Sequence, residues 1–256
     1  MTIWEPDTYN RFAAEREQPF WDLVALLDVV ERPDVVDLGC GDGRLTAALH
    51  ARLAARSTRG IDSSDAMLAS SGAHAGRGVS FEHGDLAAWP LTGDAVDIVF
   101  ANASLQWAPD HPGVLARWAA GLRPGGQIAV QVPANADHPS HVVAREVGRE
   151  LLGDDAPPDT VVANVLAPER YAELLDELGF GKQHVRLQVY AHHLSSTADV
   201  VEWVQGTSLT RFRAVLDDDE YAHFIDVYRA RLLDVLGERS PYLYPFKRIL
   251  LWGRTA

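Results

Sequence analysis

Residues 35–50, VVDLGCGDGRLTAALH, decide the fold of this 256-residue chain. An apolar run leads into a turn with three glycines, and a helical pattern follows the turn. Glycine adopts positive φ angles and lets the backbone approach a ligand, because it has no Cβ. The N-terminus of the next helix adds unpaired N–H groups and a positive dipole end. We therefore expect a strand, a tight turn and a helix that suit a nucleotide-like ligand.

The same alternation of apolar runs and helical patterns continues from about residue 34 to 133. This alternation is typical of βαβ units and a parallel sheet. The β-branched composition of the apolar runs suits strands that are buried on both faces. We expect strands at 34–38, 58–62, 79–84, 96–101 and 127–132, and helices near 44–54, 64–72 and 112–121.

The pattern changes after residue 133. Helical patterns cover 140–152, a stretch from Pro168 that Gly179 ends, and 197–237, while 182–194 and 246–253 have the pattern of strands. We predict an α/β fold: a Rossmann-like, doubly wound, mostly parallel seven-stranded sheet with a helical cap over the C-terminal edge of its strands. The expected parts are N-terminal helices with a cofactor-binding core (1–133), cap segments (134–181 and 195–243) and the last two strands (182–194 and 244–256).

Composition and charge argue against a nucleic-acid-binding protein, a membrane protein, a disulfide-linked protein and a metalloprotein. The formal net charge of −13 argues against nucleic acid or an anionic membrane as the main partner. No apolar stretch is long enough to span a bilayer, and the first residues lack the features of a secretory signal, so we expect a cytoplasmic protein. The single cysteine, Cys40, excludes an internal disulfide. No H-E-x-x-H motif occurs among the ten histidines, so we expect no metal site.

The glycine turn differs from the dinucleotide-binding motif G-x-G-x-x-G. Arg44 occupies the position of its third glycine, which weighs against a nicotinamide-dependent reductase. An acid, Asp37, precedes the first glycine by two residues. Its carboxylate would crowd a pyrophosphate but would attract an ammonium or sulfonium group. The turn therefore favours a cationic nucleoside ligand.

Two further acids follow the next two expected strands. Asp62 ends the second strand, where an acid can accept hydrogen bonds from ribose hydroxyls, although it could also simply cap the next helix. Asp85 follows the third strand and could accept from an adenine amino group, with the Leu86 N–H donating to a ring nitrogen. The carboxyl ends of neighbouring parallel strands meet at one edge, so we expect Asp37, Asp62 and Asp85 to face one crevice.

The combination D-x-G-x-G-x-G, an Asp after the second strand, G-D-L after the third and LRPGG before the fifth closely resembles class I S-adenosylmethionine-dependent methyltransferases. The resemblance implies S-adenosyl-L-methionine as methyl donor and S-adenosyl-L-homocysteine as product. It also implies that the methionine moiety lies along the glycines and that residues 101–102 pass beneath the sulfonium. The cofactor-binding residues expected on this basis are Asp37, Gly39, Gly41, Asp62, Ser63, Met67, Asp85, Leu86 and Asn102. Met67 could equally be part of a helix core.

Longer segments resemble a narrower family, the trans-aconitate methyltransferases. These segments are WEPDTYNRFAAEREQPFWDLVALL, IDSSDAML, FANASLQWAPDH, the AVQVPAN and DHPSH stretch, and FKRILL. The resemblance implies an O-methyltransferase that esterifies a carboxylate of a small polycarboxylic acid. Carboxyl groups ionise near pH 4, so the acceptor needs no general base at neutral pH. We expect no catalytic acid or base, and positioning by Asn102, Gln106 and Trp107.

A polyanionic acceptor needs cationic or hydrogen-bonding anchors, and arginine binds carboxylates in two-point fashion. The expected acceptor-binding residues are Tyr9, Arg16, Trp107, Arg211, Tyr244 and Lys247. Each also has a simpler interpretation, as a solvated or core residue. The expected partner is a small anionic carboxylic acid, with no nucleic acid and no membrane, and the expected state is a monomer or weak homodimer.

Three alternatives remain open on the sequence. The acceptor could be a malonyl group on a carrier protein, although no basic cluster for docking an acidic carrier is apparent. It could also be another small molecule. The chain could instead be a module that binds S-adenosylmethionine without transferring its methyl group.

Overall fold

The computed structural model describes residues 13–89 and 95–256, with side chains from Glu17 onward. These residues divide into two compact units. The sheet unit comprises residues 19–133, 164–188 and 248–256, and the helical unit comprises residues 13–18, 134–163 and 189–247. Each unit is described below by itself.

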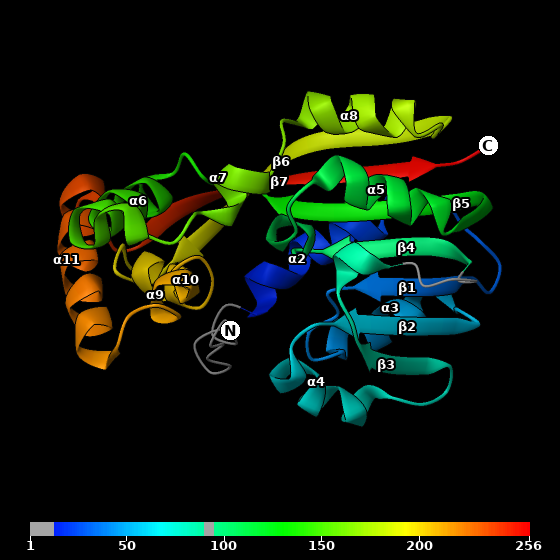
Figure 1. Ribbon diagram of the computed structural model, residues 1–256, viewed down its shortest axis with the longest axis horizontal. Coiled ribbons are helices and arrows are strands. Elements are labelled where there is room, and N and C mark those ends of the chain that lie inside the picture. The colour runs from blue at the N-terminus through cyan, green and yellow to red at the C-terminus, as the bar shows by residue number, and fades with distance from the viewer. Residues whose placement is uncertain (1–12, 90–94) are drawn as a thin grey trace. The chain divides into compact units, whose positions relative to one another are not determined.

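The strands form a seven-stranded sheet in the order β3-β2-β1-β4-β5-β7-β6 (Figure 1). The first five pair in parallel, and β7 is antiparallel to β5. The predicted mostly parallel, doubly wound sheet of seven strands is confirmed. The placement of a helical cap over the strand ends stays a prediction. The strands are β1 (Asp34–Leu38), β2 (Ser57–Asp62), β3 (Val79–His83), β4 (Val96–Asn102), β5 (Leu122–Pro133), β6 (Lys182–Leu194) and β7 (Tyr242–Arg254).

The strand positions agree with the sequence prediction, with two extensions. β5 begins at Leu122, the first residue of the LRPGG segment, because Leu122 already pairs with Val96 before the register shifts. β7 begins at Tyr242 and alternates buried and exposed residues up to Phe246. The helices that accompany the sheet are α2 (Ala13–Val24), α3 (Arg44–Leu53), α4 (Asp65–Ser71), α5 (His111–Ala120) and α8 (Pro168–Glu177), with short 3₁₀ turns η1 (Gly72–His74), η2 (Leu86–Ala88) and η3 (Leu105–Trp107).

The order of the strands creates a switch point between β1 and β4. The chain continues from β1 outward to β2 and β3, and then returns to β4 on the other side of β1. In open α/β sheets, ligands bind outside the carboxyl ends of the strands at this point. The glycine turn after β1 and the turn after β4 therefore lie where the fold places a ligand.

A buried side chain, Gln127, ties three segments of the sheet unit together. Its Oε1 accepts hydrogen bonds from the Asp28 N–H and the Trp252 indole N–H, both at 2.8 Å. Its Nε2 donates to the Asp28 carbonyl at 3.0 Å. The loop after α2, β5 and β7 are thereby joined at one fully buried amide.

Helix α8 belongs to the sheet unit, whereas the sequence analysis placed residues 134–181 among the cap segments. Its apolar face, Tyr171, Leu174 and Leu175, is buried. The Tyr171 hydroxyl lies 2.7 Å from Nδ1 of His111, whose Nε2 lies 2.9 Å from the Leu105 carbonyl. This contact joins α8 to η3 and α5, and the amphipathic pattern alone could not reveal it.

The helical unit is built from α6 (Pro139–Leu152), α7 (Thr160–Asn164, whose last residue lies in the sheet unit), η4 (Gly153–Asp155), α9 (Asp199–Gln205), α10 (Thr210–Arg213) and α11 (Asp218–Leu236). Its core contains Phe212 stacked on Phe224, with ring centroids 4.2 Å apart. Gly148 of α6 allows this packing, because a Cβ there would lie 2.5 Å from the Phe212 ring. Asp217 and Glu220 form a capping box that starts α11.

Over residues 13–89 and 95–256, no helix has the length and apolar character needed to cross a bilayer.

Replacing Tyr171 by Phe tests how α8 is held. Burial lowers the pKa of His111, so this ring is neutral at pH 7, donates from Nε2 to Leu105 and accepts the Tyr171 hydroxyl at Nδ1. The hydroxyl also accepts the Leu166 N–H at 3.3 Å. Tyr171→Phe leaves both groups without a partner, so we expect urea denaturation to show a loss of about 1–3 kcal/mol of unfolding free energy. A change below about 0.5 kcal/mol would contradict this role.

Candidate functional site

The glycine turn after β1 is held open by backbone geometry. Gly39, Gly41 and Gly43 all have positive φ angles, of 83°, 59° and 80°. The N–H groups of Gly39 and Cys40 both donate to the Ile61 carbonyl, at 2.7 and 3.1 Å. The turn therefore folds over the end of β2, and these two N–H groups are bound within the protein.

The turn after β4 packs against the first glycine. The Ser104 hydroxyl donates to the Leu38 carbonyl at 2.5 Å. A Cβ on Gly39 would lie 2.2 Å from the Ser104 Cβ, so no other residue fits at Gly39 while Ser104 stays in place. The ends of β1 and β4 are thus locked together at the switch point.

Asp62 uses both carboxylate oxygens to shape the site. Oδ2 accepts the Gly41 N–H and Oδ1 accepts the Ser64 N–H, each at 2.9 Å. Each oxygen keeps a second lone pair. Asp62 can therefore organise the glycine turn and still accept a hydroxyl of a ligand, as the sequence analysis expects for a ribose.

Asp37 lies below the glycine turn and is only 4% exposed. It accepts a hydrogen bond of 2.6 Å from the Thr46 hydroxyl of α3. Burial raises the pKa of Asp37 to about 7, with the charge of Asp62 adding to the shift and the Thr46 bond opposing it. A buried carboxyl that gains its charge near neutral pH is stabilised by a cationic ligand above it.

The other expected cofactor residues lie around the ends of β2 and β3. Ser63 is exposed and its carbonyl lies 3.1 Å from the His83 ring. Met67 is half-buried, and its terminal methyl lies 3.1 Å from where a Gly41 Cβ would stand, so it borders the turn. Asp85 is exposed and accepts the Ala87 N–H at 2.8 Å, which starts η2 at Leu86. Their contacts to a cofactor stay predictions.

The end of β4 presents polar groups that lack partners. The Oδ1 atom of Asn102 and the Oε1 atom of Gln106 are buried without a hydrogen bond in the described part of the chain. Gln106 is fixed by its Nε2, which donates to the Ala103 carbonyl at 2.7 Å. Trp107 is 42% exposed and is not a core residue.

These features fit a cationic nucleoside ligand. Buried acceptors without donors are costly, and a ligand with N–H or polarised C–H groups would satisfy them. The unpartnered oxygens of Asn102 and Gln106, the buried Asp37 and the open glycine turn all favour positive charge. The three acids lie near the carboxyl ends of the adjacent strands β1, β2 and β3, as the sequence predicts, although Asp37 is within β1 and is only 4% exposed.

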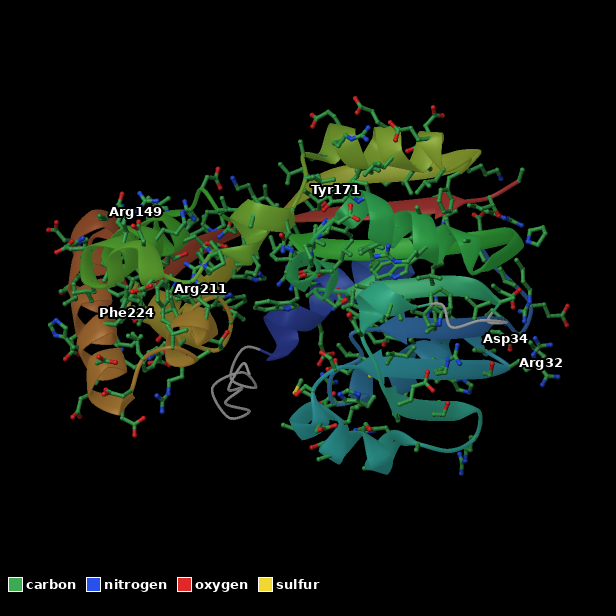
Figure 2. All side chains as sticks on the ribbon, in the orientation of Figure 1. Arg32, Asp34, Arg149, Tyr171, Arg211 and Phe224 are labelled. Atoms are coloured by element: carbon green, nitrogen blue, oxygen red, sulfur yellow. The ribbon has the colours of Figure 1, made fainter. Side chains whose placement is uncertain are left out.

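The expected acceptor-binding residues of the helical unit differ from one another in burial and in hydrogen-bond or ion-pair partners. Arg211 of α10 has a side chain only 9% exposed (Figure 2). Tyr244 of β7 is fully buried, with its hydroxyl 3.2 Å from Ser140 Oγ. Lys247 is ion-paired with Asp137. Tyr9 lies outside the described residues, as does the side chain of Arg16.

Arg211 is bound to Asp159, a residue that the sequence does not predict to belong to the site. Arg211 Nη1 lies 3.0 Å from Asp159 Oδ2, and Arg145 Nη1 lies 3.2 Å from the same oxygen. Burial by itself would raise the pKa of Asp159, but His141 and Arg211 outweigh it and hold this pKa well below its usual value. Asp159 belongs to a stretch, DDAPPDT, that has the composition of an ordinary turn, so no local signal marks it.

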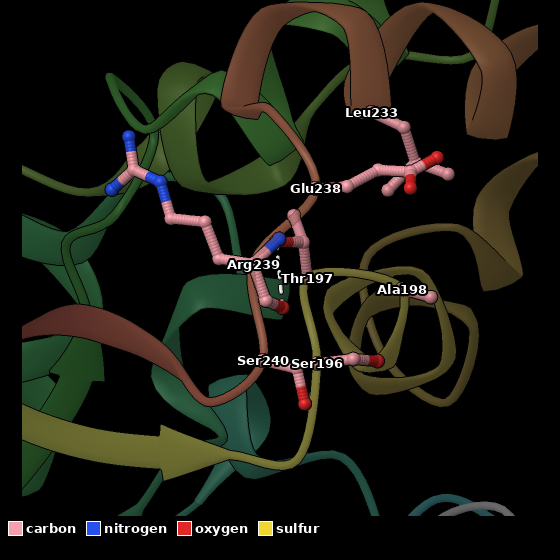
Figure 3. A pocket seen from close by; sticks show the side chains of 7 residues that line it. All are labelled: Ser196, Thr197, Ala198, Leu233, Glu238, Arg239 and Ser240. Atoms are coloured by element: carbon pink, nitrogen blue, oxygen red, sulfur yellow. Dashed lines mark hydrogen bonds between the residues drawn. The ribbon is translucent and has the colours of Figure 1, made fainter.

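The helical unit also contains a hollow of about 480 Å³ (Figure 3). Thr197 accepts the Arg239 N–H at 3.0 Å and donates to the Gly237 carbonyl at 2.9 Å, so these groups satisfy each other. None of the expected site residues that the structure describes lines the hollow, which is formed by Ser196, Thr197, Ala198, Leu233, Glu238, Arg239 and Ser240. In the part of the chain that the structure describes, no three His, Cys, Asp or Glu side chains are grouped as metal ligands would be.

Comparison with known proteins identifies close relatives along the whole chain. Residues 35–126 match the methyltransferase domain family. The trans-aconitate 2-methyltransferase of Deinococcus radiodurans is 44% identical over 255 residues, which cover 96% of each chain. A protein of the same name from Mycobacterium sp. (strain KMS) is 38% identical over 264 residues, covering 99% of this chain and 100% of the relative. The Mycobacterium tuberculosis H37Ra protein is 36% identical and covers 97% and 95%.

Solved structures agree on the fold. YcgJ of Bacillus subtilis superposes with a TM-score of 0.62 at 14% identity, covering 93% of this chain and 98% of that protein. Phosphoethanolamine N-methyltransferase 2 of Haemonchus contortus, solved with phosphomonomethylethanolamine and S-adenosylhomocysteine, gives a TM-score of 0.55 at 14% identity over 96% of this chain and 52% of that one. These likenesses concern the fold alone.

Replacing Asp37 by Asn tests the buried carboxyl. Because the folded-state pKa of about 7 exceeds the unfolded value of 3.8, the folded protein binds one more proton between these pH values. Wild-type stability should therefore fall as pH rises through this window, by up to about 1.4 kcal/mol per unit from this group. Asp37→Asn keeps an acceptor for Thr46 but cannot ionise. We expect it to be more stable than wild type at pH 8, and the difference to shrink toward pH 4, in denaturation curves measured across pH. A difference that does not vary with pH would contradict the assignment.

Replacing Gly39 by Ala tests the lock between the β1 and β4 turns. The added methyl would clash with Ser104 and would occupy a positive φ angle, so we expect at least tenfold weaker S-adenosylhomocysteine binding by calorimetry and a stability loss of about 1–3 kcal/mol. Gly72→Ala is the matched control, because Gly72 has φ −55° and nothing lies within 4 Å of its Cβ position. Adding Ser104→Gly to the Gly39→Ala variant should restore part of the affinity. Equal effects of the two alanine variants would refute the lock.

Proposed function

Because the chain belongs to the trans-aconitate 2-methyltransferase family, we propose that it esterifies a carboxylate of trans-aconitate or a closely similar small polycarboxylic acid. The observation that carries the proposal is identity of 36–44% to relatives of this name over nearly the full length of both chains. The protein is an enzyme that uses S-adenosyl-L-methionine as methyl donor and releases S-adenosyl-L-homocysteine. The choice of acid is the part that needs a direct test.

The sheet unit supplies the residues proposed to hold the donor. The glycine turn would accommodate the methionine moiety, with Asp37 beneath its ammonium group. Asp62 keeps lone pairs for the ribose hydroxyls, and the buried Oδ1 of Asn102 accepts no hydrogen bond from the described residues. The full proposed set is Asp37, Gly39, Gly41, Asp62, Ser63, Met67, Asp85, Leu86 and Asn102.

The donor supplies a methyl group on a sulfonium, and the carboxylate oxygen forms the new C–O bond as the C–S bond breaks. A carboxylate is already ionised at pH 7, so no residue has to remove a proton. The contribution of the chain is proximity and orientation, which can lower a barrier by up to about 7–11 kcal/mol. Asn102, Gln106 and Trp107, at and after the end of β4, are the proposed positioning residues.

The proposed acceptor-binding residues differ in how available their side chains are. Lys247 is committed to Asp137, and Tyr244 is packed among the aromatic residues of the helical unit. Trp107 is exposed, and Nε and Nη2 of Arg211 have no hydrogen-bond partner among the described residues, so both side chains can still bind a ligand. Tyr9 and Arg16 complete the proposed set. We also propose that the enzyme acts in the cytoplasm as a monomer or weak homodimer, with no nucleic acid or membrane partner.

The proposal is tested by incubating the protein with methyl-labelled S-adenosylmethionine and a panel of di- and tricarboxylic acids. We expect base-labile methyl ester with trans-aconitate, because methyl esters hydrolyse in alkali and N- or C-methyl products do not. Malonyl carrier protein is included as the competing acceptor. Ester formed only on the carrier would replace the proposed substrate, and tight cofactor binding without any product would indicate a binding module.

A further inference from the structure

Arg211 presents an unusual hydrogen-bonding state for a buried guanidinium. Its Nη1 is bound to Asp159, but Nε and Nη2 are buried and have no hydrogen-bond partner in the described part of the chain. These two nitrogens form the side edge of the guanidinium, which binds a carboxylate through two parallel N–H groups. The planar group is also fixed from one side, because its carbon lies 4.8 Å from the centroid of the Phe212 ring.

The charges around Arg211 do not balance. The guanidinium groups of Arg145 and Arg211 share one carboxylate, that of Asp159, whose side chain is 2% exposed. Nδ1 of His141 faces the same oxygen at 3.7 Å, beyond hydrogen-bond distance. The other oxygen of Asp159 accepts the Val161 N–H at 3.1 Å. The side chain of Arg145 is 30% exposed, so water can solvate its charge, whereas that of Arg211 is only 9% exposed and depends on partners within the protein or on a ligand.

Other polar groups of the helical unit also lack hydrogen-bond partners among the described residues, and a neutral imidazole and a hydroxyl can each donate one hydrogen bond. Both ring nitrogens of His141 are buried without a hydrogen-bond partner among the described residues, and so is the Ser208 hydroxyl. His141 follows Ser140, whose carbonyl accepts the Tyr228 hydroxyl at 2.9 Å. The sheet unit shows the opposite pattern at Asn102 and Gln106, where buried acceptors lack donors. The Arg211 cluster therefore lacks a ligand rich in acceptors.

We propose that the side edge of Arg211 binds a carboxylate of the acceptor that is not methylated, and that Asp159 positions the guanidinium by holding Nη1. This inference rests on the proposed function and names the substrate class more closely. A substrate must carry at least one carboxylate besides the one that receives the methyl group. A monocarboxylic acid would leave Nε and Nη2 of Arg211 unpaired, so we expect a lower kcat/KM for monocarboxylic acids than for polycarboxylic acids.

The test measures binding of tricarballylate, a saturated tricarboxylate, by calorimetry in the presence of S-adenosylhomocysteine. We expect Arg211→Gln to weaken tricarballylate binding about ten- to a hundredfold, because a charged hydrogen-bonded pair is lost. Affinity for S-adenosylhomocysteine should be unchanged, which also shows that the variant is folded. Arg149→Gln is the matched control: it removes the same charge from an exposed position on α6 of the same unit and should change neither constant (Figure 2).

Arg211→Lys separates two-point binding from charge alone. Lysine keeps the charge but cannot present two parallel N–H groups, so tricarballylate binding should remain at least about tenfold weaker than in wild type. Wild-type affinity in Arg211→Lys would overturn the proposal, as would wild-type affinity in Arg211→Gln. If Arg211→Gln does not fold, Arg211→Lys alone decides.

The role of Asp159 is tested by the preference for tricarboxylates. Asp159→Asn can keep the bond to Val161 but loses the charge that holds Arg211. We expect the ratio of kcat/KM for trans-aconitate to that for crotonate, an unsaturated monocarboxylate, to fall about tenfold. An equal loss on both acids would mean that Asp159 is only structural, and a raised ratio would also contradict its positioning role.

The outcomes distinguish this inference from the proposed function. Methyl ester formation from trans-aconitate with an unchanged KM in Arg211→Gln would sustain the function and refute the subsite. Arginine-dependent tricarballylate binding without methyl ester from any acid would sustain the subsite and refute the function.

Discussion

The hydrogen bond from the Ser104 hydroxyl to the Leu38 carbonyl is the contact on which the cofactor site depends. It joins the ends of two strands that are far apart in sequence, and it is possible only because Gly39 leaves room for the Ser104 side chain. Asp62 completes the frame by binding the N–H groups of Gly41 and Ser64. The backbone of the turn is therefore organised before any ligand arrives, so a ligand does not have to order it.

Periodicity and turn chemistry predicted much of the sheet, for reasons that are local. The apolar run before Gly39 and the glycines themselves define β1 and its turn, and Gly179, at φ +80°, ends α8 as expected. The assignment of α8 to the sheet unit could not be predicted in this way. It depends on the bond between Tyr171 and His111, which are 60 positions apart in the sequence.

In the candidate site, too, the features set by local sequence were predictable and those set by tertiary packing were not. Asp62 and Asp85 follow strand ends, where simple topology places them at one edge of the sheet. The burial of Asp37 and the unpartnered oxygens of Asn102 and Gln106 depend on tertiary packing, which no spacing rule reveals. Arg211 was expected to bind the acceptor because of its residue type, but Asp159 carries no such signal in the sequence. The Asp159 carboxylate binds Nη1 of Arg211, whereas Nε and Nη2 are buried and have no hydrogen-bond partner among the described residues.

The hidden carboxyl beneath the glycine turn has a thermodynamic consequence. At neutral pH a fraction of the molecules carry a hydrogen ion on Asp37, because its pKa is about 7. A positively charged ligand that binds next to Asp37 releases this proton to the solvent. The heat of complex formation will then contain the ionisation enthalpy of whichever buffer takes it up, and uptake of the ligand will strengthen as the solution becomes more alkaline.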